Sequence, residues 1–176
     1  MAQTFSTNSS VIGFDPNNMS ATALFGVGQH MLGSNNTEWV YVQAQTTING
    51  QAWVAFNSTF SAGMASATDV LNGLNIAVAN ATISASSYGW VAIRGASLSA
   101  FFTGTGSLAS TSGQLQLASS AGPTGVAMLG TVGTASCTLG GVSLVATASS
   151  SASGLGSGGA NVTLVNIVWP GLRNAP

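Results

Sequence analysis

The sequence predicts an all-β fold, a small barrel or sandwich of short, mostly antiparallel strands with an extended N-terminal arm. Apolar and polar residues alternate with a period of two over several short runs, as they do in strands. Clusters of Gly and Ser separate these runs, as turns do. No stretch has the apolar spacing of a convincing amphipathic helix. Together these features favour a barrel or a sandwich over a helical fold.

The clearest strand pattern is at residues 88–95, Tyr-Gly-Trp-Val-Ala-Ile-Arg-Gly. Side chains alternate across a strand, so Tyr88, Trp90 and Arg94 fall on one side of it. Aromatic and β-branched residues favour this conformation, and we expect Gly95 to close the strand.

Further strands are expected before this segment. Residues 38–44 alternate aromatic side chains with valines, and residues 52–56 repeat the pattern after the turn signal Asn49-Gly50. Residues 38–56 therefore favour a hairpin or a close strand pair. Residues 61–75 fit either one short helix or an irregular loop.

The remainder of the chain is expected to add short strands around Gly- and Ser-rich turns. We expect Pro170, which has no N–H, to end the last strand. The tract 149–159 is low in complexity and predicts a flexible loop within one β-rich domain, residues 26–176. The expected strands are residues 75–83, 96–102, 115–117, 125–132, 142–146 and 161–169.

Residues 1–25 are polar, with scattered apolar residues and no sustained period. We expect an extended arm that becomes ordered on a partner surface, which Phe5, Val11, Ile12 and Phe14 would contact. A merely flexible terminus is the alternative.

The large aromatic side chains are expected in the core or in an oligomer interface, and burial in the core is the favoured of the two. The residues concerned are Trp39, Tyr41, Trp53, Tyr88 and Trp90, together with Arg94.

Composition excludes several partners. Only 3% of the 176 residues are charged and the formal net charge is -1, so the chain cannot neutralise a row of phosphates. Nucleic acid and anionic membrane surfaces are therefore not expected partners. No apolar run is long enough to span a bilayer, and the start lacks a signal-peptide pattern, which indicates synthesis in a cytoplasm. So low a net charge favours self-association.

Catalytic chemistry is hard to assemble from these residues. His30 is the only histidine, Cys137 the only cysteine, and lysine is absent. Neither a nucleophile–histidine pattern nor a metal-ligand spacing occurs. The sequence therefore predicts a protein that is not an enzyme and needs no cofactor or metal.

Three segments carry a family resemblance: residues 27–44 (VGQHMLGSNNTEWVYVQA), residues 88–91 (YGWV) and residues 165–170 (VNIVWP). With them the chain resembles the capsid decoration, or cement, proteins of tailed bacteriophages. The resemblance implies a structural β-rich module on the capsid exterior, made in the host cytoplasm. It further implies that the module forms a homotrimer, binds the major capsid protein and cements neighbouring capsid subunits.

A carbohydrate-binding or fibre-type β-module, in which exposed Trp and Tyr rings stack on sugars, is the alternative function.

Overall fold

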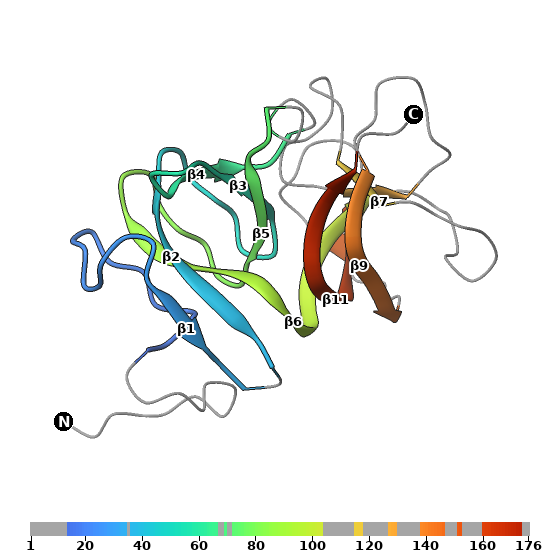
Figure 1. Cartoon of the computed structure of the whole chain (residues 1–176), viewed down its shortest axis with the longest axis horizontal. Coiled ribbons are helices and arrows are strands. Elements are labelled where there is room, and N and C mark those ends of the chain that lie inside the picture. The colour runs from blue at the N-terminus through green and yellow to red at the C-terminus, as the bar shows by residue number, and fades with distance from the viewer. Residues whose placement is uncertain are drawn as a thin grey trace.

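The computed structural model describes residues 14–34, 36–66, 69, 72–103, 115–117, 127–129, 138–146, 151–152 and 160–173; beyond residue 101 it describes only the side chain of Ile167. Every element bounded in these residues is a β-strand, which confirms the expected all-β fold (Figure 1). The strands are β1 (His30–Leu32), β2 (Glu38–Ala44), β3 (Trp53–Phe56), β4 (Ser61–Met64), β5 (Asn75–Ala79), β6 (Tyr88–Thr103), β7 (Leu115–Leu117), β8 (Ala127–Leu129), β9 (Thr138–Ala146), β10 (Ser151–Ala152) and β11 (Ala160–Arg173).

The first half of the chain forms a closed barrel of five strands. β2 pairs with β4 in parallel, and β4–β3, β3–β5, β5–β6 and β6–β2 pair antiparallel, which closes the ring. β1 adds to β2 from outside the ring. Of the two expected architectures, the structure therefore has the barrel.

The second half repeats the same pairing scheme. β6 pairs with β8 in parallel, and β8–β7, β7–β9, β9–β11 and β11–β6 pair antiparallel. β6, β7, β8, β9 and β11 thus take the places that β2 to β6 hold in the first ring, and β10 adds to β11. The long strand β6 belongs to both rings, as its course from one half to the other shows (Figure 1).

β6 bends where it passes from the first ring to the second. Gly95 has a φ of 152° and Ser97 a φ of 59°. Before the bend, β6 pairs with β2, and from Gly95 onward it pairs with β11. The expectation that Gly95 ends the strand is therefore wrong, because glycine accommodates the bend and the ladder continues on a new partner.

Two further expectations are corrected by the pairing. β2 and β3 are not a hairpin, because β4 lies between them and pairs with both. Pro170 does not end the last strand, since β11 continues to Arg173. The β9–β11 register shifts between Ile167 and Gly171, which places the residue without an N–H in an irregular part of the ladder. The expected 149–159 loop includes β10, and its other residues lie outside the described part of the chain.

The interior of the first barrel is one cluster of mostly small side chains. All five of its strands contribute, with alternate residues pointing inward as the period of two requires. Two isoleucines from the connections between strands, Ile48 and Ile83, join it and form an antiparallel bridge with each other. The buried members are Val40, Val42, Ala44, Ile48, Ala52, Val54, Phe56, Ala62, Ala77, Ala79, Ile83, Val91 and Phe101.

The outer faces of β2, β3, β5 and β6 form a second buried cluster, which holds the buried Trp and Tyr rings. Phe14 and Phe25 of the N-terminal segment pack on this cluster, and Ile167 of β11 joins it from the second half. Its buried members are Phe14, Trp39, Tyr41, Trp53, Ala55, Ala65, Ile76, Val78, Trp90, Ala92, Leu98, Ala100 and Ile167.

Candidate interaction surface

Four of the predicted aromatic residues lie in the core. Trp53 is fully buried, Tyr41 and Trp90 are 2% exposed, and Trp39 is 5% exposed. The Trp53 indole N–H donates to the carbonyl of Phe101 (3.2 Å), which ties β3 to the second half of β6. Of the two expected locations, these rings occupy the core.

Phe14 belongs to the same core and not to a free arm. Its ring centroid is 4.7 Å from that of Trp90 and 6.3 Å from that of Trp39, and only 6% of the residue is exposed. The assignment of Phe14 to a partner surface is therefore corrected. The other three expected arm contacts, Phe5, Val11 and Ile12, lie outside the described residues.

Backbone bonds hold the rest of this segment to the barrel. Ser20 and Tyr88 exchange two hydrogen bonds, of 3.0 and 2.8 Å. The Leu24 N–H donates to the Tyr41 hydroxyl (3.2 Å), and the Phe25 ring packs edge-on against Tyr41, with centroids 5.3 Å apart. The described residues of the expected arm, 14–25, are thus packed on and bonded to the barrel.

The two remaining predicted residues lie at the edge of the core. Tyr88 is half-buried and stacks on Tyr41, with ring centroids 6.1 Å apart. Arg94 is half-buried and stands opposite Glu38 across the β2–β6 ladder.

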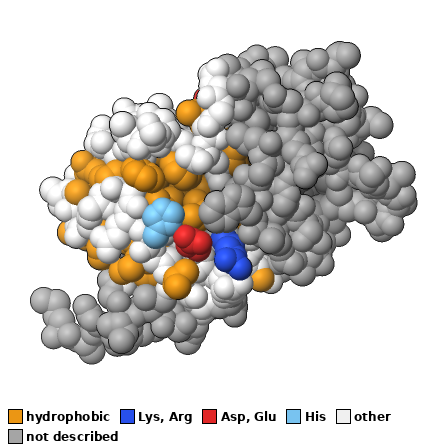
Figure 2. All heavy atoms as spheres, in the orientation of Figure 1, with side chains coloured by type: hydrophobic (Ala, Val, Ile, Leu, Met, Phe, Trp, Pro, Cys, Tyr) orange, Lys and Arg blue, Asp and Glu red, His pale blue; other side chains and the backbone are white. Residues whose placement is uncertain are grey.

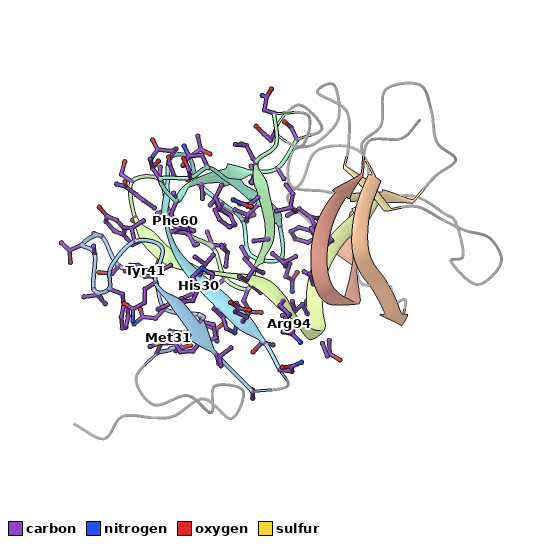
Figure 3. The ribbon with its side chains drawn as sticks, viewed as in Figure 1. His30, Met31, Tyr41, Phe60 and Arg94 are labelled. Atoms are coloured by element: carbon purple, nitrogen blue, oxygen red, sulfur yellow. The ribbon has the colours of Figure 1, made fainter. Side chains whose placement is uncertain are left out.

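A row of ionisable side chains crosses β1, β2 and β6. His30 Nδ1 donates to Glu38 Oε1 (2.8 Å), with the two side chains 50% and 21% exposed, and Arg94 follows on the next strand. Figure 3 labels His30 and Arg94, and Figure 2 shows a histidine, an acidic and a basic side chain next to one another on this face. So exposed a pair contributes little to stability. Within the described residues, no group of three or more His, Cys, Asp or Glu side chains could hold a metal ion.

Large apolar side chains are exposed along the segment that leads into β1. Leu32 is 66% exposed, Leu24 61%, Met19 45% and Val27 39%. Among the side chains that the structure describes, these four are the only exposed large hydrophobic ones, and all come from residues 19–32. We call them the apolar strip. Figure 2 shows apolar side chains gathered around the histidine of the charged row.

The apolar strip was not predicted from the sequence. Its signal was present, since residues 19–32 hold five large aliphatic side chains without the strand alternation that would bury them. What the sequence did not reveal is which apolar residues of this segment pack on the barrel, such as Phe25, and which do not, such as Leu24.

Fold and surface define a β-barrel protein that exposes four large apolar side chains on the segment leading into β1. Comparison with known protein families, curated proteins and solved structures found no match. In the part of the chain that the structure describes, no helix has the length and apolar character to cross a membrane.

Proposed function

We propose that the chain is a structural virion protein that binds the outer surface of a bacteriophage capsid and cements neighbouring major capsid subunits. The observation that carries the proposal is the apolar strip, Met19, Leu24, Val27 and Leu32. All four come from one segment of the chain, residues 19–32, and exposed apolar side chains are typical of protein–protein contact sites. The capsid as the partner comes from the family resemblance.

The electrostatics of the chain fit this role. Many identical copies crowd together on a shell, and a protein with a net charge of -1 and 3% charged residues adds little repulsion between them. The contact would depend on apolar burial and neutral hydrogen bonds, so binding should change little with salt concentration.

Two of the three segments of the resemblance adjoin the apolar strip. Residues 27–44 contain Val27 and Leu32 of the strip and continue through β1 and β2. Residues 88–91 open β6, where Tyr88 bonds to Ser20 and so fixes the segment that carries the strip.

Cosedimentation with undecorated capsids tests the proposal. The double variant Met19→Asp and Leu24→Asp, which leaves β1 unchanged, places two charges in the contact and should weaken binding about tenfold or more. Asn72→Asp, at an exposed position between β4 and β5, is the matched control and should bind as the unchanged chain does. Failure of the unchanged chain to sediment with capsids would overturn the proposal.

The N-terminal residues need a separate variant. Deletion of residues 2–12 removes Phe5, Val11 and Ile12 but keeps the buried Phe14. Weaker capsid binding with an unchanged unfolding midpoint would assign these residues to the contact, whereas unchanged binding would remove them from it.

The carbohydrate-binding or fibre-type alternative is less well supported. It needs Trp rings exposed on one face, and Trp39, Trp53 and Trp90 are all at least 95% buried. The side chain of Trp169 lies outside the described ones. A glycan array on which the chain binds sugars, together with no capsid binding, would favour this alternative.

A further inference from the structure

We propose that β1 pairs, through its outer edge, with β1 of a second copy of this chain, antiparallel and about a twofold axis. β1 ends the order of paired strands and lies on the outside of the first barrel (Figure 1). An edge strand of this kind presents unpaired backbone groups that another strand can bind.

The hydrogen bonds to β2 show which backbone groups of β1 point inward. Tyr41 N donates to Gln29 O (2.9 Å), and Gly33 N donates to Thr37 O (2.8 Å). In an antiparallel ladder, residues alternate between those that bond to the neighbour and those that do not. The backbone N–H and C=O groups of Gln29, Met31 and Gly33 therefore point toward β2.

His30 and Leu32 accordingly direct their N–H and C=O groups away from β2. No backbone hydrogen bond to another described residue uses these outward groups. The side chains of the same two residues are strongly exposed, His30 by 50% and Leu32 by 66%. No described residue thus pairs with this edge at either position.

The spacing of these outward groups makes the edge complementary to itself. When two copies pair antiparallel, His30 of each copy stands opposite Leu32 of the other, and each opposed pair exchanges two N–H···O bonds. Met31 then faces Met31 of the second copy on the axis, as a non-bonded pair with Cα atoms about 4.5 Å apart. One register satisfies every outward group of both strands.

The side chains favour the same partner. Leu32 would be covered by the His30 side chain of the second copy, and the exposed Val27 would lie close to the new contact. In each opposed pair His30 stands against Leu32, and the acidic side chain next to them, Glu38, belongs to β2 and not to the new edge. The pairing of two copies therefore sets no two acidic side chains against each other.

A three-residue edge is short, and the added contact is smaller than the roughly 1,600 Å² of a standard interface. We therefore expect a reversible dimer whose population rises with concentration. A twofold contact closes with two copies, whereas the homotrimer implied by the resemblance would need a different, unsymmetrical contact.

The first test measures the solution mass by sedimentation over a range of concentrations. Leu32→Lys should raise the dimer dissociation constant about tenfold or more, because a lysine at an edge opposes strand pairing. Leu24→Lys is the matched control, since Leu24 is equally exposed and belongs to the apolar strip but not to the edge. A monomer at every concentration, a trimer, or equal dissociation constants for the two variants would overturn the proposal.

The second test checks the register by disulfide trapping in a Cys137→Ser background. Met31→Cys places two thiols at the axis, within the distance a disulfide needs, and should form a covalent dimer on mild oxidation. Gln29→Cys is the control, because position 29 would stand opposite Gly33 and should not form one. Cross-linking at position 29 but not at 31 would contradict the register.

These outcomes are separable from those for the capsid. A chain that dimerises through β1 but never binds capsids would overturn the proposed function alone. A monomer that binds capsids would overturn the pairing of β1 alone.

Discussion

Replacement of Gly95 by alanine tests how the bend in β6 is built. Gly95 has a φ of 152°, a conformation that side chains disfavour. A Cβ placed there would lie 2.5 Å from Cγ2 of Thr37 and 3.2 Å from its Cα. Thr37 cannot move away easily, because its hydroxyl donates to the Ser34 carbonyl (2.7 Å) and accepts from the Trp39 indole (3.1 Å).

The expected cost follows from these two effects. An unfavourable positive φ costs about 1–2 kcal/mol, and forcing an added methyl group into packed surroundings costs about 1–3 kcal/mol. Gly95→Ala should therefore lower the free energy of unfolding by about 2–5 kcal/mol, a large part of the roughly 5–15 kcal/mol of a typical domain.

Alanine variants of two other glycines separate the cost of the positive φ from the cost of crowding the added methyl group. Gly73 also has a positive φ, of 73°, but a Cβ there would meet nothing within 4 Å. Gly73→Ala should thus cost only the strain, about 1–2 kcal/mol or less. Gly26 has neither a positive φ nor a neighbour within 4 Å, so Gly26→Ala should leave stability within about 0.5 kcal/mol or raise it slightly.

Urea unfolding at equilibrium, analysed by linear extrapolation, measures all three variants. The expected order of destabilisation is Gly95→Ala, then Gly73→Ala, then Gly26→Ala. If Gly95→Ala lowers the free energy of unfolding no more than Gly73→Ala does, crowding against Thr37 adds nothing and the reasoning is refuted.

Three further substitutions test the core and the charged row. Phe14→Ala should lower the free energy of unfolding by about 3–5 kcal/mol, and an effect below about 1 kcal/mol in urea would show that Phe14 is not part of the core. Trp53→Phe leaves the Phe101 carbonyl without its donor and should cost at least about 1–3 kcal/mol by thermal unfolding; an unchanged midpoint would contradict the bond. Glu38→Gln should change stability by less than about 1 kcal/mol, since the pair with His30 is exposed, and a larger loss by chemical denaturation would contradict that description.

Most strands could be predicted from the sequence because their residues alternate strictly. The expected 38–44 and 115–117 strands match β2 and β7, and the rings of Trp39 and Tyr41 lie on the opposite face of β2 from Val40, as the period of two requires. Alternation reports a local conformation, and β2 shows it over its whole length.

Pairing partners could not be predicted in this way. The strand 61–64 was not expected, because Ser-Ala-Gly-Met alternates no large side chains; yet β4 lies between β2 and β3 and closes the ring. The burial of Phe14 was also not predictable, because it depends on Trp39 and Trp90, which are distant in the sequence. Which strands meet depends on long-range contacts that no local pattern records.

Because β6 belongs to both rings, cutting the chain after it would affect the two halves differently. A fragment that stops after Thr103 keeps all five walls of the first barrel, from β2 to β6. A fragment that starts after Thr103 lacks one wall of its own ring and exposes the edges of β8 and β11, both of which pair with β6. We therefore expect the amino-terminal fragment to fold alone. The carboxy-terminal fragment lacks β6, which it needs to close its ring.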